Sequence, residues 1–253
     1  MAEELYTYEQ VTLPSKGICY PATWTKEGKI GLRPMTTEEE KIITTTRFVK
    51  SGRAIDMIFK ACLENKEIIT EDLLSGDRSF ILYYLRAMSY GAAYEYSIQC
   101  PSCGISFETV YNLNDIVIRS LKPDFSEPIK FNLPISKKVV MLRLLRGKDE
   151  IKLIEERDRR ISSYGADQTD NTVSNRIVMV AESIDGNTDK VFIEKSVNRM
   201  IAGDAAAIRN FLDDEEPGIS TNHKNICPKC SNEFVTDVPI GSSFFSVSKT
   251  KKQ

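Results

Sequence analysis

The sequence predicts an α+β protein made of two copies of one unit, in which each copy contains a β-hairpin, helices and a zinc knuckle. The two knuckles are expected to join in one shared four-cysteine site of the zinc-ribbon type. Two Cys-Pro-x-Cys motifs begin 127 residues apart, at Cys100 and Cys227. Helical apolar patterns precede both motifs, and alternating apolar residues follow them, which is typical of strands.

Composition indicates a folded protein with no general affinity for nucleic acid. The chain has 253 residues, of which 28% are charged, and its formal net charge is -2. Such a balance provides no basic field that would attract phosphate. Residues 1–5 are acidic and lack an apolar core segment, so we expect neither a signal peptide nor a membrane span.

An internal repeat underlies the predicted fold. Gly76-Asp77 and Gly203-Asp204 each precede an apolar run, and in each copy the knuckle begins 23 residues after the aspartate. The match continues without a gap, since Cys100, Pro101, Cys103, Phe107, Thr109 and Leu113 correspond to Cys227, Pro228, Cys230, Phe234, Thr236 and Ile240. Duplication is the preferred interpretation; the alternative is independent use of Gly-Asp as a helix start.

The repeat predicts two domains that pack as one compact body. The first repeat is assigned to residues 1–120, with Cys100 and Cys103 in its knuckle, and the second to residues 121–253, with Cys227 and Cys230. Upstream features occur in the same order in both copies but in a different register. The second copy therefore has an insertion, for which the polar stretches 164–171 and 185–188 are the expected loops.

The elements of each unit follow from local patterns. A β-hairpin is expected within residues 11–33 and another within 129–144. Helices are expected to start at Thr36 or Thr37 and at Gly147, and Asp77 and Asp204 are expected to cap two later helices. These later helices should end near residues 89–91 and 213–218, and strands should cover residues 94–99, 106–113 and 233–240.

Four cysteines are the predicted metal ligands: Cys100, Cys103, Cys227 and Cys230. Zinc binds four sulfurs in a tetrahedron, and each Cys-x-x-Cys turn supplies two of them. In a reducing cytoplasm this pattern favours one structural Zn²⁺ per chain over a disulfide, two independent redox pairs, or a site that has lost its metal. A filled four-sulfur shell leaves no position for a catalytic water.

No motif for catalysis is present in the sequence, so the protein is predicted not to be an enzyme. The only histidine, His223, is expected to be exposed, and the lone Cys19 and Cys62 are expected to be core residues. Acidic runs at residues 38–40 and 213–216 are interpreted as solvated helix ends and not as magnesium ligands.

Protein binding is favoured over nucleic-acid binding. Residues 249–253 form a basic tail, but the knuckles are flanked by acidic residues that would repel phosphate. Aromatic residues suit either a protein interface or the core: Tyr83, Tyr84, Tyr90, Tyr94, Tyr96, Phe244 and Phe245.

Several short segments, taken in their order along the chain, resemble baseplate hub or hub-assembly proteins of T-even-type contractile-tail bacteriophages. They are Leu13-Pro14-Ser15-Lys16-Gly17, Tyr20-Pro21, Leu32-Arg33-Pro34-Met35-Thr36, Ser89-Tyr90-Gly91, Cys100-Pro101-Ser102-Cys103-Gly104, Arg146-Gly147-Lys148-Asp149-Glu150 and Cys227-Pro228-Lys229-Cys230.

The resemblance implies a non-enzymatic role in phage tail morphogenesis, as a minor baseplate component of the virion or as a chaperone-like assembly factor. The implied partners are phage baseplate or hub proteins, met in the host cytoplasm during assembly, and no small-molecule substrate is implied. The alternatives are a zinc-containing nucleic-acid-binding regulator and, third, a metallohydrolase. The sequence does not indicate which surface binds a partner.

Overall fold

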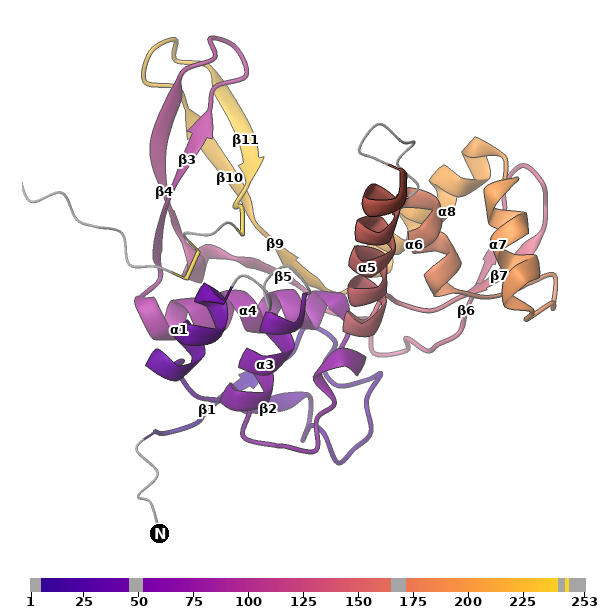
Figure 1. Ribbon diagram of the computed structural model, residues 1–253, viewed down its shortest axis with the longest axis horizontal. Coiled ribbons are helices and arrows are strands. Elements are labelled where there is room, and N and C mark those ends of the chain that lie inside the picture. The colour runs from indigo at the N-terminus through magenta and orange to yellow at the C-terminus, as the bar shows by residue number, and fades with distance from the viewer. Residues whose placement is uncertain (1–5, 46–51, 165–171, 241–243, 246–253) are drawn as a thin grey trace, which may run out of the picture.

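The computed structural model of this protein describes residues 6–45, 52–164, 172–240 and 244–245. Its mixed helices and strands confirm the α+β class. Figure 1 shows two lobes and an arm of two hairpins that rises above the first lobe. No helix in the described ranges has the length and apolar character needed to cross a membrane.

The first lobe begins with the predicted hairpin, and helices pack over it. Its elements are β1 (Glu9–Thr12), β2 (Lys29–Leu32), α1 (Thr37–Thr44), α3 (Arg53–Cys62), the short η1 (Thr70–Asp72) and α4 (Ser75–Tyr90). Thr36 is the N-cap of α1, as predicted, and it forms a capping box with Glu39. α4 ends before Gly91, also as predicted.

The second lobe has its own apolar core. Its elements are β6 (Ile129–Asn132), β7 (Val139–Leu142), α5 (Gly147–Tyr164), α6 (Thr172–Val180), β8 (Ala181–Ile184), α7 (Lys190–Asn198) and α8 (Ala202–Glu215). The strands form one antiparallel sheet in the order β6-β7-β8. Asp185 and Gly186 form the predicted turn, with φ of 50° and 81°, while most of the other predicted loop, residues 165–171, lies outside the described residues.

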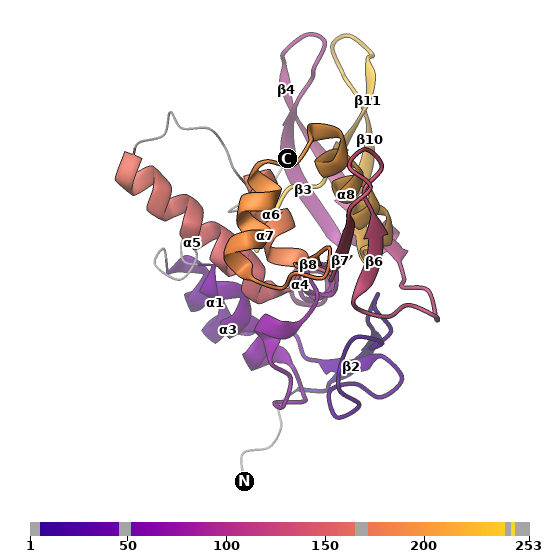
Figure 2. The ribbon, with the colours of Figure 1, turned by 90° about the vertical axis from the view of Figure 1, so that its right-hand side faces the viewer.

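The arm consists of two antiparallel hairpins that come from different halves of the chain. They are β3 (Ala93–Gln99) with β4 (Ser106–Asn112), and β10 (Asn222–Ile226) with β11 (Glu233–Asp237). Figures 1 and 2 show the hairpins side by side, with their loops at the same end of the arm. After β4 come the short η2 (Leu113–Asp115) and β5 (Val117–Arg119), and β5 pairs with β9 (Gly218–Ser220) below the arm.

The prediction that Asp77 and Asp204 cap helices is wrong. Both side chains instead accept hydrogen bonds from the backbone of the hairpin in the same lobe. Asp77 accepts from the N–H of Ser15 (2.9 Å), and Asp204 accepts from those of Ile135 (2.8 Å) and Ser136 (3.0 Å). These hairpin turns contain amides with no partner inside the turn, so a buried carboxylate satisfies them better than it would satisfy its own helix.

The last described residues of the chain complete the core of the first lobe. Phe244 is fully buried, with its ring centroid 4.9 Å from that of Tyr83 and 5.1 Å from that of Tyr94. Its carbonyl oxygen accepts a hydrogen bond from the buried Arg86. Phe244 is therefore a core residue, as are Tyr83, Tyr94 and Tyr96, whereas Phe245 is only partly buried.

Two glycines at matching places in α4 and α8 have different surroundings. A Cβ atom on Gly76 would lie 1.6 Å from the carbonyl oxygen of Pro217, which is fixed backbone next to β9. A Cβ on Gly203 would lie 2.5 Å from Cδ1 of Ile135, which is the end of an exposed and flexible side chain. Of these two glycines, only Gly76 is required for close packing of two backbone segments.

We therefore expect Gly76→Ala to lower the free energy of unfolding by about 2 kcal/mol or more, because α4 and β9 must separate. The matched control Gly203→Ala should change it by less than about 1 kcal/mol, since alanine favours the helix and Ile135 can move. Urea unfolding of both variants measures this difference. Equal losses in the two variants would contradict it.

Candidate metal centre

The four predicted ligand cysteines come together at the tip of the arm. All four Sγ atoms lie within 4.8 Å of one another. The Sγ–Sγ distance is 3.7 Å between Cys100 and Cys230 and 3.6 Å between Cys103 and Cys227. Sulfurs in a regular tetrahedron about 2.3 Å from zinc are about 3.8 Å apart, whereas a disulfide bond is about 2.05 Å long. The cluster is compatible with one structural zinc site.

Each knuckle is held by the same pair of backbone hydrogen bonds. Cys100 donates its N–H to the Ile105 carbonyl oxygen (2.9 Å) and accepts at its own carbonyl from Gly104 (3.0 Å). In the second knuckle, Cys227 donates to Asn232 (3.0 Å) and accepts from Ser231 (2.9 Å). The residue after each second cysteine is left-handed, with φ of 72° at Gly104 and 56° at Ser231, which suits glycine or a small polar residue.

The environment of the cluster favours a thiolate at one cysteine in particular. Burial alone would raise the pKa of Cys227, but the backbone amides of Cys230 and Lys229 lower it to about 6. At Cys103 the Ile105 amide lowers the pKa, but burial and the other three thiols raise it to about 11. A divalent cation would replace these hydrogen bonds among the thiols, because it binds each cysteine as a thiolate.

Aromatic residues join the two hairpins below the cysteines. The Tyr96 hydroxyl and Nδ1 of His223 are hydrogen-bonded at 2.8 Å, and the ring of Tyr111 lies 5.2 Å from the histidine ring. Phe107 and Phe234 meet edge to face at 6.3 Å. His223 is thus partly buried between the hairpins and not freely exposed as predicted, because two tyrosines enclose it.

A buried amide links the same two hairpins. Asn225 is 4% exposed, and its Oδ1 accepts a hydrogen bond from the Thr109 hydroxyl at 3.0 Å. Its Nδ2 donates to the His223 carbonyl oxygen and to Oγ1 of Thr236, each at 3.0 Å. Both amide hydrogens of Asn225 and its carbonyl oxygen therefore have partners. Sequence reasoning missed this residue because an isolated Asn in a strand carries no recognisable pattern.

The remaining candidates do not form a second site. Cys62 is fully buried and Cys19 partly buried, and burial raises the pKa of each thiol to about 12. The prediction that the acidic run at residues 38–40 is solvated is wrong for Glu39. This residue is only 4% exposed and forms an ion pair with Arg33 at 3.0 Å. Within the described ranges, the four cysteines are the only group of three or more His, Cys, Asp or Glu side chains that could hold a metal.

The fold and the site define a structural class of protein, with two lobes and an arm that carries a four-cysteine cluster at its tip. A model of the family described as T4 bacteriophage base plate protein matches residues 6–246. The chain belongs to this family, and the resemblance to T4-type phage baseplate proteins is confirmed. No curated protein and no solved structure matches it. The family supports a baseplate-related structural or assembly role and a place in the virion tail.

The hydrogen bonds of the Asn225 side chain are expected to stabilise the arm. Asn225→Ala should lower the free energy of unfolding by about 2–3 kcal/mol, because it leaves the Thr109 hydroxyl and the His223 carbonyl without their partner. The control Lys224→Ala removes an exposed neighbour and should cost less than about 0.5 kcal/mol. Thermal unfolding of both variants measures this, and a loss as small as that of the control would contradict the assignment.

Proposed function

We propose that this chain is a non-enzymatic protein of baseplate hub assembly, in which one structural zinc fixes the arrangement of two halves that bind other phage baseplate or hub proteins. The main support for this proposal is the cluster of four cysteine Sγ atoms, two from each half of the chain, which lie within 4.8 Å of one another. Membership of the base plate family supports the biological setting. The proposed ligands are Cys100, Cys103, Cys227 and Cys230.

We further propose that the halves are repeats, 1–120 and 121–253, related by a pseudo-twofold axis through the arm. In a twofold arrangement a residue on the axis touches its own counterpart, and off-axis contacts occur in reciprocal pairs. Tyr96 and His223 are counterparts 127 residues apart, and they hydrogen-bond to each other. Phe107 and Phe234, also 127 apart, pack together.

The cysteines and the lobes support the same relation. The nearest sulfur contacts cross between knuckles, from the first cysteine of each to the second of the other. At the base of each lobe an arginine pairs with a carboxylate six residues later, as Arg33 with Glu39 and Arg143 with Asp149. Asp77 and Asp204 bind the hairpins in the same manner. Crossed contacts between the halves, and equivalent contacts within each half, are expected for two copies of one ancestral unit.

Zinc in this proposal is structural. A shell of four cysteines is closed, so it provides folding energy and no open position for substrate or water. Each knuckle hairpin has only two strands, and an isolated two-stranded hairpin is marginally stable in water. The chain's own contribution is to present four sulfurs from two turns that the arm's hydrogen bonds already orient.

The nucleic-acid alternative is not favoured, because the family finding supports a baseplate role. The basic tail on which it partly rested, residues 249–253, lies outside the described residues. We propose action in the host cytoplasm during assembly, either as a minor component that stays in the virion or as a chaperone-like factor that leaves.

A phage that lacks this protein, complemented with a tagged copy, tests the proposed role. We expect baseplate hubs to be absent without the chain and restored with it, as seen by electron microscopy of tail intermediates. Mass spectrometry of purified tails then separates a component, which is retained, from an assembly factor, which is absent. Normal hubs in the absence of the chain would refute the proposed function.

The zinc assignment is tested by elemental analysis of the purified chain. We expect one zinc per chain in the wild type and none in the double variant Cys227→Ser, Cys230→Ser, with a loss of about 3 kcal/mol or more in unfolding free energy. The matched control Cys19→Ser alters a lone cysteine outside the cluster and should retain one zinc. Zinc that persists in the double variant would contradict the shared site.

A further inference from the structure

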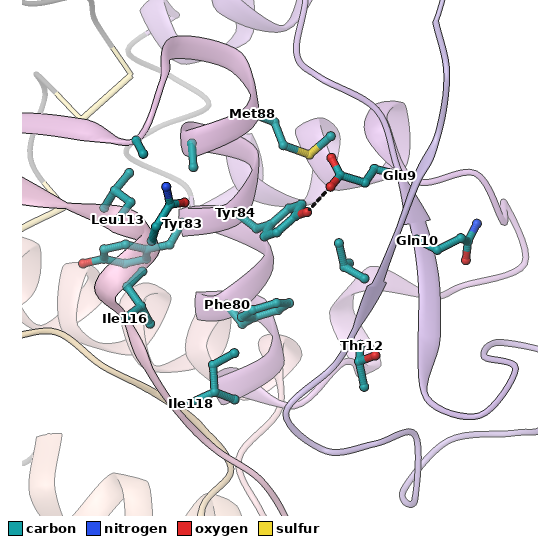
Figure 3. Close-up of a pocket in the computed structure, with 14 residues that line it drawn as sticks. Glu9, Gln10, Thr12, Phe80, Tyr83, Tyr84, Met88, Leu113, Ile116 and Ile118 are labelled. Atoms are coloured by element: carbon teal, nitrogen blue, oxygen red, sulfur yellow. Dashed lines mark hydrogen bonds between the residues drawn. The ribbon is translucent and has the colours of Figure 1, made fainter.

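A groove with a cavity volume of about 600 Å³ lies between β1 and α4 on the first lobe. Figure 3 shows β1 along one side, Phe80, Tyr84 and Met88 of α4 in the middle, and Ile116 and Ile118 on the far side. We call this feature the β1 groove. Neither the cysteine cluster nor the contacts within the arm use it.

The β1 groove exposes one edge of a strand. No second strand pairs with β1 besides β2 in the described part of the chain. Leu13 donates its N–H to the carbonyl of its opposite residue Gly28 at 2.9 Å, and hydrogen-bonded pairs alternate along antiparallel strands. Gln10 and Thr12 therefore direct their N–H and C=O groups away from β2. Gly31, opposite Gln10, correspondingly gives its carbonyl to a donor on the far side of β2.

All four residues of β1 line the groove, as expected where a strand presents its edge and not only one face. The opposing wall is apolar, with Phe80 and the partly buried Ala87 and Met88. An apolar ligand without a backbone would leave the free amide and carbonyl groups of β1 unpaired. A peptide in extended conformation satisfies both the edge and the wall.

The charge of the groove restricts the occupant further. Glu9 is the only charged residue among those that line it, and no Lys or Arg is present there. Its carboxylate accepts a hydrogen bond from the Tyr84 hydroxyl at 2.7 Å, which holds the negative charge at the mouth. A second copy of β1 would bring another Glu9 and only one apolar residue, Val11, so it complements the groove poorly.

We propose that the β1 groove binds an extended segment of a partner protein, which adds to β1 as a strand, places apolar side chains at alternate positions and carries Lys or Arg near Glu9. That the partner is a phage baseplate or hub protein rests on the proposed function. The recognition itself follows from the free edge, the apolar wall and the single carboxylate. Backbone pairing would supply affinity, and the wall and Glu9 would supply selectivity.

Three eight-residue peptides with alternating Val and Thr test the proposal, one with Lys at both ends, one with Glu and one with Ser. With the full chain in calorimetry, the Lys peptide should bind at least about tenfold more tightly than the Glu peptide. A Lys peptide in which the Val residues are grouped together should bind at least about tenfold more weakly than the alternating one. On binding, the amides of Gln10 and Thr12 should exchange more slowly with solvent.

Variants of residues that line the β1 groove test whether the peptides bind there. Ala87→Arg fills the wall, and Thr12→Pro removes a free-edge donor while leaving the pairing with β2 intact; each should reduce affinity at least about tenfold. Glu9→Lys should reverse the preference to the Glu peptide. The control Val235→Arg changes an apolar residue on β11, 56% exposed, and should bind like the wild type.

Three outcomes would overturn the proposal. The first is that no peptide binds, and the second is that folded Ala87→Arg and Thr12→Pro bind the Lys peptide as tightly as the wild type does. The third is self-association of the chain through this groove in sedimentation experiments. Peptide binding requires neither zinc nor phage assembly. If the peptide binds but the chain does not restore hub assembly, the proposed function is refuted and the groove proposal stands. If the chain restores hub assembly but no peptide binds, only the proposal for the β1 groove is refuted.

Discussion

The structure depends on the junction of two hairpins that are far apart in sequence. Closing a chain segment of more than a hundred residues costs only a few kcal/mol beyond a short loop, because the entropic penalty grows logarithmically with length. The contacts at the arm oppose that cost: crossed sulfur contacts, the Asn225 amide and the Tyr96–His223 pair. Below the arm, β5 pairs with β9, and Phe244 packs in the core of the first lobe.

Sequence motifs that occur twice made much of this fold predictable from sequence. The two knuckles, the hairpins that open each lobe and the ends of α4 and α8 follow from local signals: cysteine spacing, alternation, and Gly or Pro at helix ends. The sequence also identified which four cysteines belong together, because a pattern that occurs twice at one offset gives each motif a counterpart. The cluster of Cys100, Cys103, Cys227 and Cys230 in the structure agrees with that pairing.

The features that sequence reasoning missed are long-range. Asp77 looks like a helix cap locally, but its partner is Ser15 on a hairpin 62 residues away. His223 looks exposed in the sequence, but the β3–β4 hairpin places Tyr96 beside it. Phe244 has no local signal for a core whose residues come more than a hundred positions earlier. Between α1 and α4, the described part of the first lobe has α3, a single bridge from Leu32 to Leu63 and the short η1, where the second lobe has α6, β8 and α7. The sequence motifs shared by the two halves therefore did not predict β8 or α7.

X-ray absorption spectroscopy at the zinc edge, on the full chain as a monomer, tests the junction most directly. If one ion joins both knuckles, the first shell consists of four sulfurs at about 2.3 Å and no lighter atom. Two sulfurs with nitrogen or oxygen ligands would mean that each knuckle binds metal separately. That result would contradict a shared site and remove the proposed link between the two halves.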